Sequence, residues 1–402
     1  MKSIFSNLTD DQKKWKEQVD AVLKVELEPH VEAIESGKKD VIDVIKALGK
    51  HGYCGITFPE KYGGLGLTVM HELILTEAIC SYSLPVDMSR LSGSYPAMLA
   101  KFFGKMRDLK DYIEPLVKGE KIGAFCFTEP DAGSDLSRMK TIAEKDPATG
   151  ELILTGEKRF ITNGSVADVL VVYARNGAFI IDSKWKGFEV VEEYKMMGLH
   201  GLHLGHIKFN AIRVPAKNAL FFTEIKPASA GQGKTGKTDA ISAMQDMLSP
   251  ERIMLSVQAL GVAKTALKIA SDYSQSREQF KQPISAFEGI SFKIADMATK
   301  FEAAKALVEK SVNAMQNGTL AAMAKLFSCQ VAFEICDDAV QILGGIGYTN
   351  KYPVERCLRD VRLLRIGGGT DEIMKYIIQK GIYKGEMEKE LKPGDAKPSM
   401  FG

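Results

Sequence analysis

The 402-residue sequence lacks several features that mark whole classes of protein. Basic residues are not in surplus, because 53 Lys+Arg stand against 51 Asp+Glu and leave a net charge of +2, whereas a nucleic-acid binder usually has a basic excess. No run of 18 apolar residues occurs, so no membrane span is expected. The N-terminal residues Met1 to Asn7 contain no apolar core of a secretion signal, and acidic residues follow soon after.

Cysteine pairs at metal-binding or redox spacing are also missing. No CxxC pair occurs, so neither a zinc ribbon nor a thioredoxin-like site is indicated. Several of the cysteines lie in apolar runs, as buried free thiols do. The sequence therefore predicts a protein of a reducing compartment, most simply the cytoplasm. The six cysteines are Cys54, Cys80, Cys126, Cys329, Cys336 and Cys357.

What is present is the composition of an ordinary globular protein, with 45% hydrophobic and 26% charged residues. At roughly 100–200 residues per domain, the length predicts two to four domains. The pattern divides the chain into a helical zone (1–121), a zone of short apolar runs between Gly, Asn and Asp clusters (122–222), a linker (223–240), a second helical zone (241–385) and a charged tail (386–402). The expected fold class is α+β, with the sheet between two helical parts.

Individual elements can be placed within these zones. Thr9 and Gln12 have the spacing of a capping box, which predicts an amphipathic helix to about Ile34. Further helices are expected over residues 40–51, 69–80 and 95–103, and strands over residues 152–155, 169–173 and 178–181. The second helical zone should contain four or five long helices, interrupted by glycines at 344, 345 and 347 and again at 367–369.

Three segments carry residues suited to binding a phosphate or an aromatic ring. In Gly123–Asp135 (GAFCFTEPDAGSD), a strand would lead into a turn that presents backbone N–H groups and hydroxyls. Lys158–Gly164 (KRFITNG) supplies an aromatic, a threonine and an Asn-Gly turn, and Ser276–Ile284 (SREQFKQPI) sets an arginine near a phenylalanine. Each segment taken alone is more simply an ordinary turn, a hairpin or a helix end.

The order of these segments is more specific than any one of them. Pro59–Leu67 (PEKYGGLGL) comes before them, and Gln341–Tyr348 (QILGGIGY) and Arg359–Ile373 (RDVRLLRIGGGTDEI) come after them. In this order they resemble the acyl-CoA dehydrogenase family, over about residues 5–385. The resemblance implies an N-terminal helical domain, a middle β-sheet or barrel domain and a C-terminal four-helix bundle.

The resemblance also implies FAD as cofactor and an acyl-CoA thioester as substrate, with hydride passing from the substrate β-carbon to flavin N5. Carried over position by position, the residues that would contact FAD are Phe127, Thr128, Ser134, Phe160, Thr162, Arg277, Phe280, Gln341, Gly344, Gly345, Thr370 and Glu372. Those that would contact the CoA thioester are Ser134, Arg252 and Gly368. Arg277 would reach the FAD of a neighbouring subunit, so the resemblance implies an oligomer, usually a homotetramer.

The catalytic base departs from the commonest family pattern. The reaction needs a carboxylate that removes the α-proton, and many members place a glutamate directly before the Gly-Thr pair, where this chain has Gly368. Members resembling isovaleryl-CoA and long-chain acyl-CoA dehydrogenases carry the base just before an arginine on the first C-terminal helix. Pro250, Glu251 and Arg252 occupy that place, and the proline suggests a helix start. Glu251 is therefore the candidate base, although a first-turn glutamate favoured by the helix dipole is the structural alternative.

Other functional interpretations stay open at this point. Relatives that oxidise cyclic substrates, such as cyclohexene carboxyl-CoA, use an aspartate of the N-terminal domain, and Asp87 could serve there or could cap a helix. A flavin-binding relative without dehydrogenase activity, acting as a scaffold, is a second alternative, and an oxidase is a third. The resemblance implies an electron-transferring flavoprotein as electron acceptor, whereas the acyl chain length, branching or ring is not predicted.

Two further patterns suggest other chemistry. His200, His203 and His206 have HxxHxxH spacing, but no carboxylate or cysteine nearby in the sequence completes a metal site, and no metal is predicted. Gly231–Thr238 (GQGKTGKT) matches the P-loop pattern of nucleotide hydrolases. A P-loop needs a buried strand directly before it, and residues 225–230 do not read as one, so we interpret this segment as part of the linker.

Overall fold

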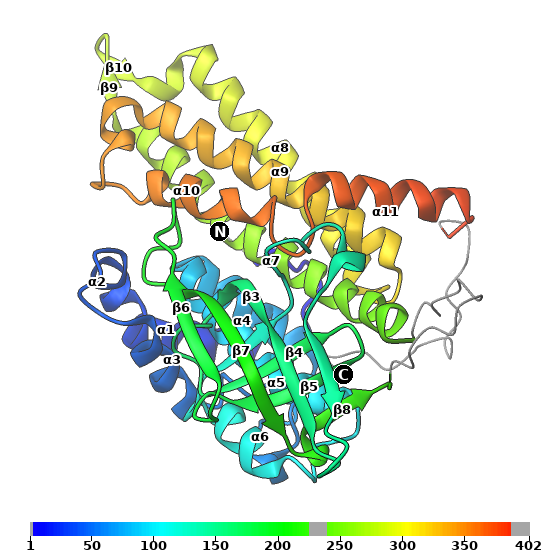
Figure 1. The fold of residues 1–402 in the computed structure, drawn as a ribbon. Helices are drawn as coiled ribbons and strands as arrows, with labels where there is room; N and C mark the ends of the chain where they lie inside the picture. Colours follow the sequence, from blue (N-terminus) through cyan, green and yellow to red (C-terminus); the bar gives the residue numbers. More distant parts are fainter. Residues whose placement is uncertain (1–2, 225–238, 387–402) are drawn as a thin grey trace.

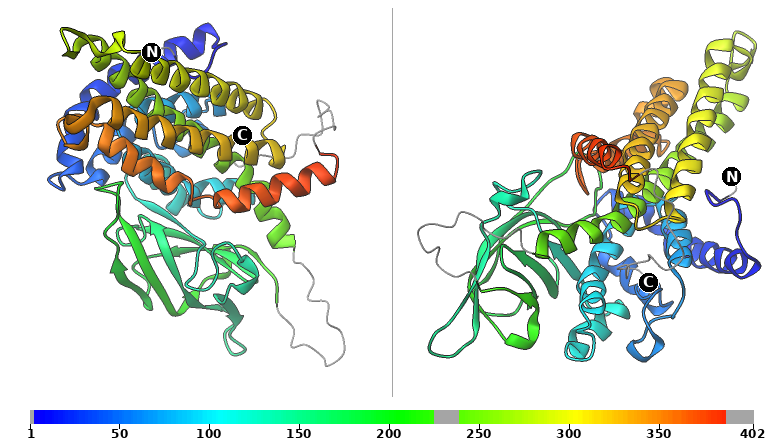
Figure 2. Two further views of the ribbon diagram at one scale, coloured as in Figure 1. Left: turned by 90° about the horizontal axis from the view of Figure 1, so that it is seen from above. Right: turned by 90° about the vertical axis from the view of Figure 1, so that its right-hand side faces the viewer.

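The structure is a computed structural model that describes residues 3–224 and 239–386, the side chains of residues 239–248 excepted. Helices occupy both ends of the described chain, and the strands between them gather on one side (Figures 1 and 2). The α+β order of helices, sheet and helices is thereby confirmed. The helices are α1 (Asp10–Glu26), α2 (Val31–Glu35), α3 (Val41–Lys50), α4 (Val69–Cys80), α5 (Leu84–Phe102), α6 (Lys110–Val117), α7 (Asp239–Ser276), α8 (Glu288–Val312), α9 (Gly318–Leu343), α10 (Val354–Leu364) and α11 (Asp371–Tyr383). The strands are β1 (Gly123–Cys126), β2 (Ile142–Lys145), β3 (Leu152–Thr162), β4 (Val169–Ala174), β5 (Gly177–Asp182), β6 (Phe188–Glu193), β7 (Leu204–Val214), β8 (Ala219–Phe222), β9 (Glu278–Gln279) and β10 (Gln282–Pro283).

The first helix begins where its capping signal predicts. The side-chain oxygen of Thr9 accepts from the Gln12 N–H, and the Gln12 side chain accepts from the Thr9 N–H, at 3.3 and 3.0 Å. The helix ends earlier than predicted, because a 3₁₀ turn around Pro29, which has no backbone N–H to donate, separates α1 from α2. α4 has the predicted bounds, whereas α5 begins eleven residues earlier than the predicted 95, at Leu84.

Two four-stranded sheets form the middle of the chain. One has the order β1-β4-β5-β8, with β1 and β4 parallel, and the other has the antiparallel order β2-β3-β7-β6. β4 is buried on both faces: Val169 and Val171 belong to the core shared with the helices, whereas Leu170 and Val172 belong to the core between the sheets. Its unbroken apolar sequence is explained by this double burial.

The Asn163-Gly164 turn does not close the hairpin that its sequence suggests. β3 pairs with β2 and β7, whereas the next strand, β4, lies in the other sheet. Asn163 adopts a φ of 63°, and its buried amide donates to the carbonyl oxygens of Ser89 and Gly123 at 2.9 and 3.0 Å. The turn therefore carries the chain from one sheet to the other and ties β1 to α5.

The long helix α7 runs through Pro250. The prediction that a helix begins at this proline is wrong, because α7 starts at Asp239. A proline inside a helix removes one backbone hydrogen bond, and the packing of α7 against α4, α8 and α9 compensates for that loss. Glu251 consequently does not lie in a first helical turn, so the helix dipole does not explain its presence.

Within the described residues, two segments are long and apolar enough to span a membrane by length and composition, Ser249–Ser276 and Gly318–Tyr348. In each segment most of the apolar window is buried inside the fold, 78% and 67% respectively. Core helices of folded domains commonly pass the same test, so this is weak evidence for a span. We interpret both segments as the central helices of the C-terminal bundle.

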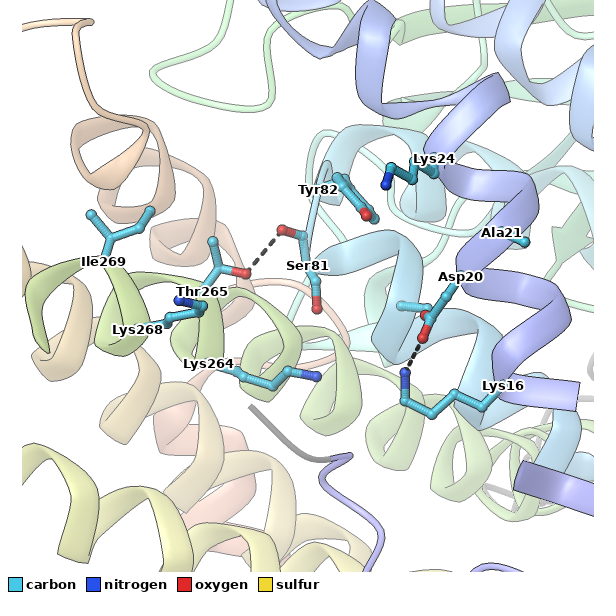
Figure 3. Close-up of a pocket in the computed structure, with 11 residues that line it drawn as sticks. Lys16, Asp20, Ala21, Lys24, Ser81, Tyr82, Lys264, Thr265, Lys268 and Ile269 are labelled. Atoms are coloured by element: carbon cyan, nitrogen blue, oxygen red, sulfur yellow. Dashed lines mark hydrogen bonds and ion pairs between the residues drawn. The ribbon is translucent and has the colours of Figure 1, made fainter. Parts of the chain in front are cut away.

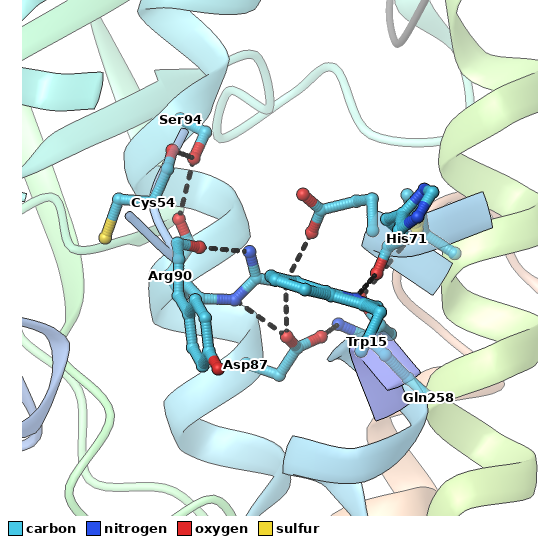
Figure 4. A network of polar contacts seen from close by, with 11 residues as sticks. Trp15, Cys54, His71, Asp87, Arg90, Ser94 and Gln258 are labelled. Carbon is cyan, nitrogen blue, oxygen red and sulfur yellow. Dashed lines mark hydrogen bonds and ion pairs between the residues drawn. The ribbon is translucent and has the colours of Figure 1, made fainter. Parts of the chain in front are cut away.

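Arg90 on α5 forms a buried ion-pair network (Figure 4). Its guanidinium is 1% exposed and donates to Asp87 Oδ1 at 2.7 and 3.1 Å, to Glu72 Oε1 at 2.6 Å and to the carbonyl oxygen of Tyr53 at 2.9 Å. Both carboxylates are also buried. The single cation therefore offsets two enclosed negative charges and joins α4, α5 and the segment after α3.

We expect the substitution Arg90→Met to lower the free energy of unfolding by about 3–5 kcal/mol, because it leaves two buried carboxylates without a counter-charge. Urea denaturation followed by circular dichroism measures the change. Lys13→Met is the matched control, since Lys13 pairs only with Asp10 on the surface and its loss should cost less than about 1 kcal/mol. Equal stability of the two variants would contradict the proposed role of Arg90.

Candidate active site

The end of β1 and the end of β3 bring together predicted flavin-contact residues. The Arg159 N–H donates to the carbonyl oxygen of Thr128 at 2.8 Å, and Lys158 Nζ donates to that of Phe127 at 2.9 Å. Phe160 has a φ of 56° and a side chain that is 58% exposed. A bulky residue with positive φ is uncommon and often marks a functional position.

A buried ion pair fixes the loop that follows Thr128. Lys158 Nζ lies 2.8 Å from Glu129 Oε1, and both side chains are almost fully enclosed. Burial lowers the pKa of Lys158 to about 8 despite its carboxylate partner. Glu129 also accepts from the backbone N–H groups of Lys140 and Thr141. The pair therefore holds both ends of the loop that carries Ser134, which itself is exposed.

Thr162, at the end of β3, meets the N-terminal helices. The Ser92 hydroxyl of α5 donates to the Thr162 carbonyl oxygen at 3.3 Å. The main chain of this predicted flavin contact is thus held by α5.

Glu251 lies on α7 with a half-buried side chain. Burial raises the pKa of Glu251 from 4.5 to about 6, and the nearby charges of Arg252 and Lys325 oppose that rise. A carboxylate whose pKa lies near neutrality has the proton affinity that a general base needs. The side chain is therefore suited to accept a proton from a bound molecule.

Two cations lie beside Glu251. Arg252 is 6% exposed, and its Nε finds no hydrogen-bond partner among the described residues. Burial lowers the pKa of Arg252 and that of Lys325. Lys325 Nζ donates to the carbonyl oxygen of Gly369 at 2.7 Å, which anchors the glycine turn to α9. The unsatisfied Nε of Arg252 is the kind of group that a bound ligand would complete.

The side-chain space at Gly368 is already filled. Gly368 has a φ of 63°, and a Cβ atom there would lie 2.2 Å from Leu255 Cδ1. Leu255 follows Glu251 by one helical turn on the same face of α7. Glu251 on α7 and a glycine at position 368 are therefore found in the same chain, and Leu255 occupies the space that a side chain at 368 would need.

An aromatic stack joins α5 to β1. Tyr95 of α5 stacks on Phe125 with ring centroids 4.9 Å apart, and Phe125 stacks on Phe127 at 5.7 Å. Burial raises the pKa of Tyr95 well above 10, and the Glu251 carboxylate adds to the shift. Tyr95 therefore lies within electrostatic reach of Glu251 and stacks on the strand that carries the predicted flavin contacts.

Asp87 occupies a different environment. Oδ1 accepts from Arg90, and Oδ2 accepts from Gln258 Nε2 at 2.8 Å. The residue lies within α5, whose N-cap is Ser83, so it does not cap a helix. Because both oxygens are engaged and the side chain is 0% exposed, the geometry describes a structural carboxylate.

A second group of predicted FAD contacts lies around β9, β10 and the C-terminal end of α9. Arg277, Phe280 and Gly345 line one hollow of about 670 Å³, and Gln341 and Gly344 lie at the end of α9 beside it. Figure 1 shows this region, around β9 and β10, remote from β1 and β3. The single chain therefore does not unite the two groups of predicted FAD contacts.

The remaining FAD candidates lie at the start of α11. Thr370 caps this helix, and its hydroxyl accepts from the Ile373 N–H at 3.3 Å. The backbone N–H of Glu372 and the Thr370 side chain lower the pKa of Glu372. Free N–H groups at a helix start are suited to polar or anionic ligand atoms.

The three histidines of the HxxHxxH pattern have separate partners. His200 Nδ1 lies 2.9 Å from Glu35, His203 lies 3.1 Å from Asp40, and His206 lies 3.4 Å from Glu157. His203 also contacts Glu193 at 2.9 Å. The pKa of His203 is raised overall: burial acts to lower it, but the carboxylates of Asp40 and Glu193 have the larger effect. Within residues 3–224 and 239–386, no group of three or more potential metal ligands occurs.

Figure 3 shows a second hollow, of about 450 Å³, between α1 and α7. Three of the lysines around it are neutralised by carboxylates: Lys16 by Asp20, Lys264 by Glu77 and Lys268 by Asp272. The hollow therefore offers little net charge to an anion. The P-loop-like segment Gly231–Thr238 lies outside the described residues.

Sequence reasoning missed Tyr95, Lys158 and Lys325. Lys325 stands alone among apolar residues of α9, and a lone cation on a buried face is a signal that could have drawn attention to it. Tyr95 and Lys158 give no such signal, because their partners Phe125 and Glu129 become neighbours only in the fold.

Comparison with known proteins identifies the family. Models of the N-terminal, middle and C-terminal domains of acyl-CoA dehydrogenases match residues 9–120, 124–212 and 241–383. The chain belongs to the acyl-CoA dehydrogenase family. Members of this family are FAD-dependent oxidoreductases that act on CH–CH bonds.

Similar proteins cover nearly the whole chain. An acyl-CoA dehydrogenase of Bacillus subtilis (strain 168) is 37% identical over 398 residues, which cover 94% of this chain and 100% of that protein. Butyryl-CoA dehydrogenase from Megasphaera elsdenii has a structure with a TM-score of 0.83 at 34% identity, covering 94% and 100%. An acyl-CoA dehydrogenase from Bacillus anthracis complexed with FAD has a TM-score of 0.84 at 29% identity, covering 97% and 70%.

FAD fits the residues that are present. Phe160 and Phe280 offer exposed ring faces, 58% and 87% accessible. A Cβ atom built at Gly344 or Gly345 would meet nothing within 4 Å, so a ligand could approach that backbone closely.

We expect the substitution Gly368→Ala to lower the free energy of unfolding by about 1–3 kcal/mol, because the new methyl group meets Leu255. Gly66→Ala is the matched control, since Gly66 has the same φ of 63° but open space around it. Thermal or urea unfolding measures the difference, and Leu255→Ala should relieve part of it in the double variant. If Gly66→Ala costs as much, backbone strain alone is responsible and the steric argument fails.

Proposed function

We propose that this protein introduces a double bond between Cα and Cβ of an acyl-CoA thioester, with Glu251 as the base. The observation that carries the proposal is the half-buried Glu251 carboxylate, whose pKa of about 6 suits proton abstraction. It lies one helical turn from Leu255, which fills the side-chain space at Gly368. FAD, when bound, supplies the acceptor for the hydride that leaves Cβ. The overall change is loss of one proton and one hydride from the thioester.

The residues around Glu251 would prepare it for this step. Desolvation by the bound thioester would make the carboxylate a stronger base than it is in water, while Arg252 and Lys325 would limit that rise. A backbone N–H near Gly368 would donate to the thioester carbonyl oxygen and stabilise the negative charge that develops there. Glycine at 368 keeps this N–H, so loss of the side chain does not remove carbonyl activation.

The proposed binding roles follow the geometry described above. Phe127, Thr128, Phe160 and Thr162 would hold the flavin ring, and Ser134 would contact phosphates or the CoA portion. The helix start at α11, through Thr370 and Glu372, would contact the adenosine side, and Arg252 would lie near the pantetheine. The predicted contacts around β9, β10 and the end of α9 would reach the FAD of a neighbouring subunit: Arg277, Phe280, Gln341, Gly344 and Gly345.

We propose a homotetramer, in which a neighbouring subunit supplies the second group of FAD contacts. Its support is the distance between the hollow at β9 and β10 and the strands β1 and β3 of the same chain (Figure 1). An electron-transferring flavoprotein is the proposed electron acceptor. A cytoplasmic location is proposed as well, and the six cysteines, all free and buried, support a reducing compartment.

The first experiment is an anaerobic titration of the purified holoprotein with straight-chain, branched and cyclic acyl-CoA esters, followed by flavin absorbance. Bleaching by one group of esters would establish the reaction and the substrate group together. Flavin bands that no ester bleaches would favour a flavin-binding scaffold instead. A protein that takes up no flavin, even from added FAD, would contradict the proposal altogether.

The substitution Glu251→Gln should slow flavin reduction by about 10²–10⁴-fold, because an amide cannot accept the α-proton. Stopped-flow absorbance with the best ester measures the rate. Asp87→Asn is the matched comparison, another carboxylate-to-amide change on a facing helix, and should retain most of the rate. The opposite result, a fast Glu251→Gln and a slow Asp87→Asn enzyme, would assign the base to Asp87 and favour a cyclic substrate.

The pKa of Glu251 also predicts two pH effects. The apparent kcat/KM should fall tenfold per pH unit below about 6, because the base is then protonated. Since the folded pKa lies above the value of 4.5 for an exposed glutamate, stability relative to Glu251→Gln should decrease by about 1.5 kcal/mol as pH rises from 4.5 to 6.5. Urea titrations of both proteins at each pH test this. A stability difference that does not change with pH would contradict the raised pKa.

A further inference from the structure

The peptide that joins Phe127 to Thr128 is held from the interior of the β domain. Its carbonyl oxygen, which belongs to Phe127, accepts from Lys158 Nζ of β3 at 2.9 Å. The next carbonyl oxygen, that of Thr128, accepts from the Arg159 N–H at 2.8 Å. The Lys158 side chain is 0% exposed, so its ammonium lies inside the fold. Two neighbouring residues of β3 therefore fix the orientation of the chain directly after β1.

The opposite side of the same peptide carries the Thr128 N–H. In a trans peptide the carbonyl and the N–H of the next residue point in opposite directions. Because the Phe127 carbonyl points to the enclosed Lys158, the Thr128 N–H points away from it. Thr128 is only half-buried, and within residues 3–224 and 239–386 no acceptor is found for this N–H. The N–H is therefore available to a bound molecule.

Lys158 brings a positive charge to the carbonyl. Burial lowers the pKa of Lys158 to about 8, so the ammonium form predominates at neutral pH. Two titratable groups act on it, Glu129 at 2.8 Å and Cys126 of β1. Burial raises the pKa of Cys126, so the thiol stays protonated. The cation is thus balanced by the Glu129 carboxylate, which also accepts from the N–H groups of Lys140 and Thr141.

A cation on a carbonyl oxygen changes the N–H of the same peptide. It draws electron density toward the oxygen, and the N–H becomes a stronger donor because hydrogen bonds in series polarise one another. A stronger donor favours the form of its acceptor that carries more negative charge. Phe127 and Thr128 are two of the proposed flavin contacts, and hydride transfer adds negative charge to the flavin ring. Lys158 can therefore influence the ring without touching it.

We propose that Lys158 is a positioning residue, which aims and polarises the Thr128 N–H toward the flavin ring and thereby raises the reduction potential of bound FAD. The proposal rests on the binding roles proposed above, because they place Thr128 at the ring. It adds a division of labour to them. Thr128 contacts the ring, whereas the residue that adjusts its potential lies wholly inside the β domain.

The test measures the two-electron midpoint potential of the holoprotein by equilibration with a redox dye, in the absence of acyl-CoA. The double substitution Lys158→Met with Glu129→Gln removes both charges together, so no unpaired charge is left in the interior. At pH 7 it should shift the equilibrium about tenfold toward the oxidised form, the value of roughly one hydrogen bond, which is a fall of about 30 mV. Lys13→Met with Asp10→Asn is the matched control on the surface and should leave the potential unchanged.

The pH profile separates polarisation from a merely structural role. The difference in potential between wild type and the double variant should be largest below pH 7 and should shrink above about pH 8, where Lys158 loses its proton. Lys158→Arg retains the charge at every pH in this range. Its potential should therefore equal that of wild type at pH 7 and exceed it at pH 9.

The contrary results are equally distinct. A shift of less than twofold in the double variant at pH 7, or a difference that is the same at pH 6.5 and 9, would overturn the role of Lys158 and leave the dehydrogenase function intact. If neither variant folds with FAD, the wild-type potential decides: its decline with pH should steepen near pH 8, and a constant slope would overturn the proposal. Flavin that dithionite reduces but no acyl-CoA reduces would overturn the proposed function and not the role of Lys158.

Discussion

The enclosure of one carboxylate is the constraint on which the rest of the site depends. Glu251 is half-buried, and its pKa of about 6 results from burial against two nearby cations. Without enclosure the group would be a weaker base, and without Arg252 and Lys325 its pKa would be higher still. The long helix α7, the glycine turn held by Lys325 and the packing of α5 against α7 all serve to keep this balance.

The position of the proposed base on α7 is coupled to the glycine turn before α11. Leu255 fills the volume that a side chain at position 368 would need, so a glutamate at 368 would require the Leu255 side chain to move. A change of base position therefore involves at least two sites, one that gains the carboxylate and one that releases or takes up space. The backbone at Gly368 keeps its N–H through such a change, so the proposed carbonyl contact does not depend on which residue carries the proposed base.

The sequence predicted the fold class and most elements well, because α4 and β4 carry strong local patterns. It failed where long-range contacts override local signals. Pro250 reads as a helix start, yet packing continues α7 through it. Asn163-Gly164 reads as a hairpin turn, yet its buried amide joins β1 and α5. The family resemblance located Glu251, whereas Tyr95 became visible only when Phe125 and Glu251 were placed around it.

The hydrogen bond between Asp87 and Gln258 joins groups that are 171 residues apart in the chain. Closing so long a loop costs chain entropy before the contact returns any stability, and contacts of this kind generally slow folding. The contact between α5 and α7 therefore cannot form until α7, which follows the whole β domain in the sequence, has been synthesised. Until then Asp87 Oδ2 lacks the Gln258 amide as its donor, whereas the Arg90 ion pairs join residues that have all been made already.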